Sequence, residues 1–279
     1  MTDQMPATSQ PIPLQTSDSR IPPLSDALSR LMGLTSTERT NPRTFELLTL
    51  KDPAAVARLI SLSNAAGYHR SGNSVKSVRD AVRVIGTRAS YDALLAIFTL
   101  DLVTFPTHLQ PLRNFLTRHI FSVLATARRI APYASPEHVV ADQTHLAFVA
   151  IVDKLGIALA MGRMHGATMP AMMAVASDSR HWLHGMPEFD EAFELSAQVA
   201  RSWDMSEEVP QDLEHLARWA EHMPVMSSAC HHVLAAEALL DAKKGMGNDA
   251  LLEAPFRDWP VIQNLFTRGV DPMSLVADW

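Results

Sequence analysis

The sequence predicts an all-α fold, and two observations support the prediction. Hydrophobic residues make up 47% of the chain and aromatic residues only 6%, with many Ala, Leu and Val, which favours helices packed on helices. Apolar residues recur at helical spacing along most of the chain, whereas no alternating run of β-branched residues bounded by turn residues stands out. At 279 residues, the chain can bury a substantial core in one large domain or two small ones.

The N-terminus divides into a tail and the start of the fold. Residues 1–20 are rich in Ser, Thr, Gln and Pro, so we predict a disordered tail that cannot bury enough surface to offset its ordering entropy. The folded part opens at Ile21. A first helix carries leucines at helical spacing, namely Leu24, Leu28, Leu31 and Leu34. A second helix is expected from Pro42 to Leu50.

Three helices with sharp boundaries follow between residues 50 and 102. Asp52 and Pro53 start the first, because a carboxylate suits the N-cap and proline suits the first helical position. A small polar break covers residues 64–73, and a second apolar stripe then ends at Gly86, which can take a positive φ. Thr87 is expected to cap the third helix, which stops before Pro106.

Helices joined by proline and glycine breaks are also predicted in the second half of the chain. An amphipathic helix runs from Leu112 to Ile130. The next is expected to begin at Pro136, and its nearly unbroken apolar run from Leu146 to Met161 indicates a helix at the domain centre. Further helices are expected at 188–203, from Ser206 through Trp219, at 227–243, and around Ile262 and Met273.

Charge and composition exclude several classes of protein. The net charge is −6 and the pI about 6.0, so a nucleic acid is not expected as a direct partner. Cys230 is the only cysteine, which excludes an intrachain disulfide and favours a reducing cytoplasm. The N-terminus has no signal pattern and no apolar run reaches the roughly 18 residues of a membrane span, so no membrane association is expected.

The order of helix, asparagine-bearing loop, short helix, glycine and helix resembles the HDOD family, bacterial signalling modules related to the HD metal phosphohydrolases. The matching elements are D-P at 52–53, L-S-N at 62–64, the aromatic Tyr68, S-V-x-x-A-V at 77–82 and I-G at 85–86. The resemblance implies a multi-helical bundle of two packed subdomains. Residues 21–105 would form the N-terminal helical subdomain, and residues 106–279 a degenerate HD-like subdomain.

The resemblance also implies where metal ligands would lie. It places the first histidine at His119, the His-Asp pair at Val152 and Asp153, and a further histidine at Ala192. Because valine and alanine cannot coordinate a metal, we expect a vestigial site with no metal, no cofactor and no catalysis. His119 and Asp153 both fall on apolar helix faces; each either bonds to backbone or pairs with the other, His119 donating to the carboxylate.

Two segments are candidate interaction surfaces. The first is the loop that carries Asn64, Tyr68 and Arg70, although Asn64 can equally serve the turn by bonding neighbouring backbone. The second is the methionine-rich run 161–173, since thioether side chains repack easily against a partner, or else fill gaps in a core.

These observations lead to one predicted function and two alternatives. The prediction is a non-catalytic signalling or regulatory module in a bacterial cytoplasm that acts by binding a protein signalling partner. The first alternative is a metal-dependent phosphohydrolase or phosphodiesterase with a rearranged site. The second is a small-ligand sensor, for instance for a nucleotide, that uses the vestigial cavity. The sequence does not predict the oligomeric state.

Overall fold

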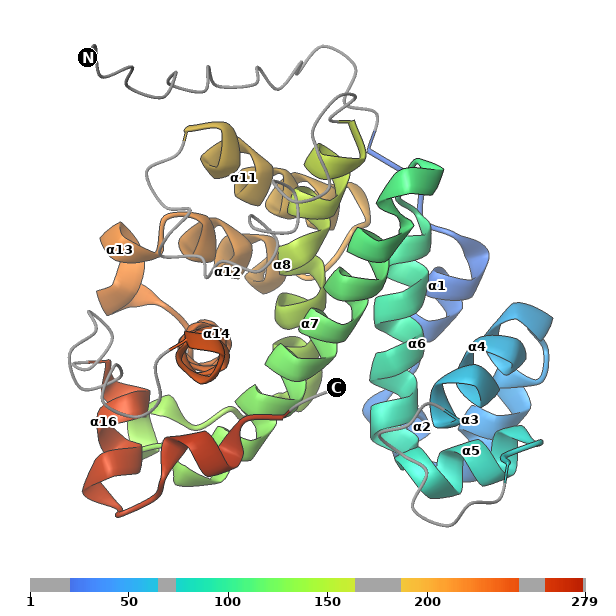
Figure 1. The fold of residues 1–279 in the computed structure, drawn as a ribbon, viewed down its shortest axis with the longest axis horizontal. Helices are drawn as coiled ribbons and strands as arrows, with labels where there is room; N and C mark the ends of the chain where they lie inside the picture. Colours follow the sequence, from blue (N-terminus) through green and yellow to red (C-terminus); the bar gives the residue numbers. More distant parts are fainter. Residues whose placement is uncertain (1–20, 65–73, 164–186, 246–258, 278–279) are drawn as a thin grey trace, which may run out of the picture.

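The computed structural model describes residues 21–64, 74–163, 187–245 and 259–277, and all regular elements in these ranges are helices (Figure 1). This confirms the all-α prediction. The first half contains a series of α-helices: α1 (Asp26–Met32), α2 (Ser36–Thr40), α3 (Pro42–Thr49), α4 (Pro53–Ser63), α5 (Val78–Ile85) and α6 (Thr87–Asp101). The predicted tail, residues 1–20, lies outside the described residues.

Side-chain caps start several of these helices. Asp52 Oδ1 accepts hydrogen bonds from the backbone N–H groups of Ala54 at 2.9 Å and Ala55 at 3.3 Å, which confirms the predicted start at Asp52 and Pro53. The sequence prediction missed α2. This five-residue helix is held by a capping box in which Thr35 and Glu38 each bond the other's backbone N–H.

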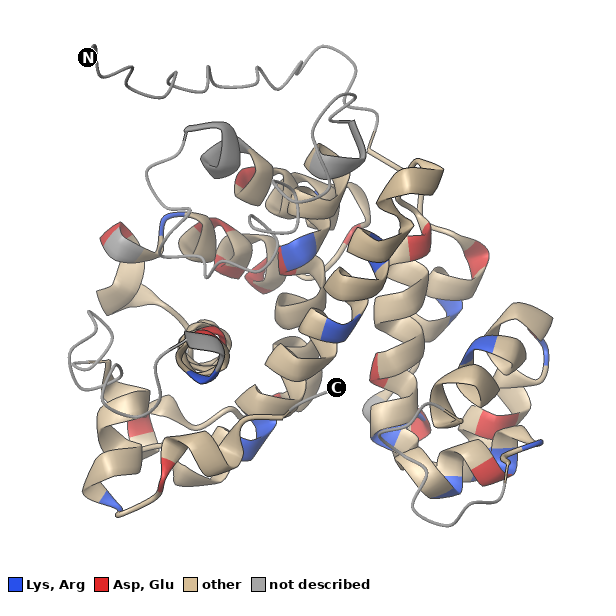
Figure 2. Ribbon diagram, in the orientation of Figure 1, with Lys and Arg blue, Asp and Glu red and all other residues tan. Residues whose placement is uncertain are grey.

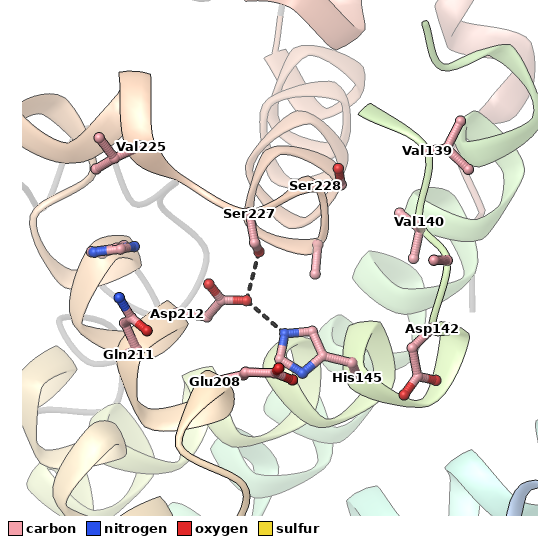
Figure 3. Close-up of a pocket in the computed structure, with 13 residues that line it drawn as sticks. Val139, Val140, Asp142, His145, Glu208, Gln211, Asp212, Val225, Ser227 and Ser228 are labelled. Carbon is pink, nitrogen blue, oxygen red and sulfur yellow. Dashed lines mark hydrogen bonds and ion pairs between the residues drawn. The ribbon is translucent and has the colours of Figure 1, made fainter. Parts of the chain in front are cut away.

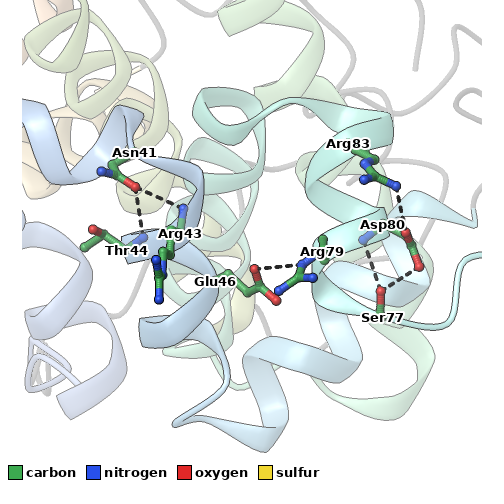
Figure 4. A network of polar contacts seen from close by, with 8 residues as sticks. All are labelled: Asn41, Arg43, Thr44, Glu46, Ser77, Arg79, Asp80 and Arg83. Atoms are coloured by element: carbon green, nitrogen blue, oxygen red, sulfur yellow. Dashed lines mark hydrogen bonds and ion pairs between the residues drawn. The ribbon is translucent and has the colours of Figure 1, made fainter.

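The junction between α5 and α6 depends on a glycine. Ser77 caps α5 by accepting from the Asp80 N–H at 3.1 Å, and Arg79 on α5 donates to Glu46 on α3 at 3.3 Å (Figure 4). Gly86 ends α5 with a φ of 90°, a backbone conformation that side-chain-bearing residues rarely adopt. The prediction of a Thr87 cap was wrong, because Gly86 is itself the N-cap of α6 and makes no side-chain bond.

Helix α6 lies between the two halves of the fold. Its residues from Ser90 to Leu100 are all buried. On one side α6 contacts α1, α4 and α5, and on the other α7 and α8 (Figure 1). One hydrophobic core therefore runs through both halves, from Leu28 to Val276. The division into subdomains at residue 105 stays a prediction.

The second half surrounds two long helices, α7 and α8. Its elements are η2 (Thr107–Leu109), α7 (Gln110–Ile130), η3 (Ala131–Tyr133), η4 (Pro136–His138), α8 (Gln143–Arg163), α11 (Pro187–Ser202), α12 (Glu208–Ala217), α13 (Trp219–His222), η5 (Met223–Val225), α14 (Ser228–Gly245), α16 (Pro260–Thr267) and η6 (Pro272–Leu275). Helix α8 packs against α7, α11, α12 and α14, so the helix with the longest apolar run is central, as predicted.

Three predicted boundaries in this half were wrong. Proline at 136 begins only a 3-10 turn, and α8 begins after Asp142, whose carboxylate accepts from the Thr144 N–H at 2.7 Å. The helix expected through Trp219 breaks at Arg218, whose φ of −120° and ψ of 45° are not helical. Asp271 caps a 3-10 turn rather than an α-helix. In each case a short proline-containing or irregular turn replaces a continuous helix.

A glycine allows α8 and α11 to approach closely. A Cβ atom on Gly156 would lie 1.9 Å from the Ala192 carbonyl oxygen. The Ser196 hydroxyl bridges the two helices: it accepts from the Gly156 N–H at 2.9 Å and donates to the Asp153 carbonyl at 2.8 Å. Asp153 is thereby held at the contact between α8 and α11.

Among the described helices, α8 is the one that is long and apolar enough, by length and composition alone, to cross a membrane, over Gln143–Ala160. Within that window 78% of the residues are buried inside the protein, as in the core helix of a globular fold. The window contains Asp153 and Lys154, which are both buried, so it is not an unbroken apolar run.

Candidate functional site: the HD-like centre and a polar pocket

The four residues of the predicted vestigial HD centre lie on α7, α8 and α11. His119 on α7 is buried and stacks on Phe115, with ring centroids 6.0 Å apart and the planes 10° from parallel. Asp153 on α8 is 1% exposed. Both residues thus lie in the interior, as the apolar faces of their helices predict. A direct pairing of His119 with Asp153 stays a prediction.

A buried lysine lies beside Asp153. The Lys154 Nζ atom is 3.5 Å from Asp153 Oδ2 and 2.5 Å from Glu237 Oε1 on α14. All three side chains are buried, and the ammonium group also lies 5.8 Å from the centre of the Phe193 ring. We call Asp153, Lys154 and Glu237 the Lys154 cluster. An ammonium between two carboxylates compensates charges that would be costly to bury alone.

The two aliphatic positions of the centre lie in apolar surroundings. Val152 packs with residues of α11 and α12 in a small cluster of its own, which contains Ala197, Ala200, Val209 and Leu213. Ala192 is buried against Gly156 at the contact between α8 and α11. The structure therefore brings Asp153 close to Lys154 and Glu237, while Val152 packs toward α11 and α12.

These residues do not fit the divalent metal of an HD hydrolase. Two of the four positions are aliphatic, and an ammonium group already lies against the Asp153 carboxylate. Across the described ranges, no three His, Cys, Asp or Glu side chains are grouped so that they could hold a metal ion.

Asn64 serves the framework of the fold. Its amide nitrogen donates to the carbonyls of Ile60 at 3.0 Å and Val75 at 2.8 Å, and its oxygen accepts from the Val75 N–H at 2.8 Å. The turn-bonding interpretation of Asn64 is therefore confirmed for this residue. Tyr68 and Arg70 lie outside the described residues, as does most of the methionine-rich run 161–173.

A polar pocket of about 370 Å³ lies between α8, α12 and the start of α14 (Figure 3). Asp212 is at its centre: one carboxylate oxygen is 2.6 Å from His145 Nε2 and accepts from the Ser227 hydroxyl, also at 2.6 Å. The hydrogen bond to Asp212 raises the pKa of His145, against the opposing effect of burial, and the charges of Glu208 and Asp142 add to the increase.

The arrangement of Ser227, His145 and Asp212 differs from that of a nucleophilic catalytic triad. Ser227 and His145 both donate to Asp212, so the imidazole does not stand between the hydroxyl and the carboxylate as it does in a nucleophilic triad. The pocket was not predicted from the sequence. Ser227 ahead of a helix was a detectable cap, and it also accepts from the Cys230 N–H at 3.2 Å, but nothing in the sequence linked it to His145.

The chain belongs to the HDOD family, because the HDOD domain model matches residues 21–218, well over half of its length. No curated protein sequence matches the chain. An HDOD domain protein of Geobacter sulfurreducens has a similar solved structure, with a TM-score of 0.62 at 14% identity, covering 92% of this chain and 87% of that one.

Two proteins of Shewanella amazonensis SB2B are also similar in structure, each at 17% identity. The "Putative phosphohydrolase" has a TM-score of 0.58 and covers 91% of this chain and 88% of that one. The "Putative metal-dependent phosphohydrolase" has a TM-score of 0.50, with 90% and 83% covered. At such identities the likeness establishes the shared helical fold.

Proposed function

We propose that this HDOD protein is a non-catalytic signalling or regulatory module of a bacterial cytoplasm that acts by binding a protein partner. The Lys154 cluster is the observation that carries the proposal. Asp153, the carboxylate that would bind metal in a working HD centre, is neutralised by an internal ammonium group 3.5 Å away. A divalent cation would have to displace that ammonium from a buried site and would meet Val152 and Ala192 in place of histidines.

The distribution of charge supports a protein partner over a nucleic acid. Acidic and basic residues are interspersed over the described helices (Figure 2), and the net charge is −6. Binding to a phosphate backbone relies on a concentrated positive face. The buried thiol of Cys230, whose Sγ lies 3.4 Å from the Asp212 carbonyl, is consistent with a reducing compartment.

Metal content and hydrolysis test the non-catalytic part of this proposal. The purified full chain is expected to contain no stoichiometric Mn, Fe, Zn or Mg, and to leave bis(p-nitrophenyl) phosphate intact when manganese is added. A Val152→His variant should also be inactive, because Ala192 still leaves a ligand missing. Stoichiometric metal together with manganese-dependent turnover would establish the rival function, a phosphohydrolase with a rearranged site.

Partner binding needs a separate experiment. Co-purification from the native host should recover a specific protein, and Arg70→Glu in the candidate loop should weaken its capture. Arg268→Glu is the matched control, since Arg268 is an exposed arginine just after α16. An equal loss of partner capture with both variants would indicate a general charge effect. Unchanged capture with Arg70→Glu would show that the loop is not part of the binding surface.

A further inference from the structure

A second cavity, of about 200 Å³, lies where the first half of the fold meets the second. Arg39 at the end of α2 and Arg88 in the first turn of α6 line one side. The segment from Ala141 to Thr144, which leads into α8, lines the other. Two arginines thus share one small cavity between segments that are distant in sequence.

Arg88 has spare hydrogen-bonding capacity. Its side chain is half-buried, and within the described ranges no acceptor or ion-pair partner holds its guanidinium group. Burial lowers the pKa of Arg88, and the positive charge of Arg128 lowers it further, although Asp92 and Asp142 act in the opposite direction. Arg88 thus lines the cavity as a cation that, among the described residues, has no close ion-pair partner.

Two carboxylates, Asp92 and Asp142, also line the cavity, and both are already engaged. Asp92 is ion-paired with Arg128, and Asp142 accepts the Thr144 N–H at the start of α8. Arg39 uses one N–H to reach the Met32 carbonyl at 3.0 Å, and its guanidinium lies 5.4 Å from the centre of the Tyr91 ring, so it is fixed in place. Arg88, which lines the same cavity, is the arginine whose guanidinium group is left for a ligand.

We propose that this cavity binds a compact phosphate group, either inorganic phosphate or the phosphate of a small metabolite. The planar forks of arginine match phosphate oxygens in pairs, and two arginines line the cavity. Its volume of about 200 Å³ is sufficient for a phosphate group with a few carbon atoms. The site does not depend on the proposed function.

Calorimetry and thermal unfolding of the full chain test this site with inorganic phosphate, against chloride at matched ionic strength. Phosphate should bind saturably and raise the melting temperature, because a ligand that binds only the folded state stabilises it. Arg88→Gln should raise the Kd at least roughly tenfold. Arg88→Lys keeps the charge but loses the planar fork, so its Kd for phosphate should lie between those of the wild type and Arg88→Gln. The matched control is Arg83→Gln, an exposed arginine on α5 that should bind as the wild type does.

Glycerol 3-phosphate, measured in parallel, distinguishes the two sources: tighter binding than inorganic phosphate indicates a metabolite, and weaker binding indicates the free ion. Circular dichroism establishes whether each variant is folded. If Arg88→Gln does not fold, Arg88→Lys still tests the site. The proposal is overturned if millimolar phosphate gives no saturable heat, or if chloride stabilises the chain equally. Unchanged binding by both Arg88 variants would also overturn it.

Discussion

Replacing Gly156 with alanine should destabilise the protein, although alanine is the better helix former. The new Cβ would lie 1.9 Å from the Ala192 carbonyl oxygen and 2.6 Å from Ser196 Oγ, whereas ordinary contacts begin at 3.4 Å. Helix α11 would therefore have to move by 1.5 Å, the difference between 3.4 and 1.9 Å. Such overpacking costs about 1–3 kcal/mol. Loss of the Ser196 bond to the Gly156 N–H costs about 1 kcal/mol.

The gain in helix propensity offsets about 1 kcal/mol of this cost, which leaves a net loss of about 1–3 kcal/mol. For a chain of this size that corresponds to a fall of about 2–10 °C in melting temperature. Thermal unfolding followed by circular dichroism measures it. Gly33→Ala is the control, because its Cβ would meet nothing nearer than 3.4 Å and its φ of −72° suits alanine. If Gly156→Ala melts with the wild type, the close contact between α8 and α11 is wrong.

Asp153→Ala should cost on the order of 1–3 kcal/mol in urea unfolding, because it removes a buried partner, and a smaller loss would refute a paired carboxylate. His145 has a raised pKa, so its contribution to stability is present below pH 6.5 and is lost as the pH rises through the folded pKa; His145→Gln should flatten stability across that range. Burial lowers the pKa of His231 to about 4, so the wild type should lose stability as the pH falls from 6.5 to about 4, and His231→Gln should reduce this loss. A chain beginning at Arg20 should melt within about a degree of the full chain, since residues 1–20 offer no apolar face; a larger fall would show that the tail packs.

Local chemistry made much of the fold predictable. The cap at Asp52 and the turn at Gly86 depend on residues adjacent in sequence, so a single segment predicts them. The short helix α2 was missed because five residues carry too little periodicity, although its Thr35 and Glu38 capping box was visible in the sequence. Boundaries failed where 3-10 turns took the place of helices, since both begin with the same proline signal.

The candidate sites were less predictable because they depend on packing between distant helices. Asp153 was found from the resemblance and from its place on an apolar face, but its contact with Lys154 and the participation of Glu237 on α14 required the arrangement of α8 and α14. The pocket around Asp212 likewise joins residues of α8, α12 and the segment before α14. Helical periodicity predicts which face of a helix is buried, but it does not predict which other helix covers that face.

The three hydrogen bonds of Asn64 have a consequence for how this family can diversify. Two of them join the end of α4 to Val75 and the third bonds Ile60 within α4, so the Asn64 side chain connects the two ends of the intervening segment. The two ends of this segment are thus joined by Asn64 and Val75, which lie outside residues 65–73. Changes of sequence or length there should be tolerated, which makes this segment a natural place to alter partner choice, or to graft a binding peptide, without redesigning the bundle.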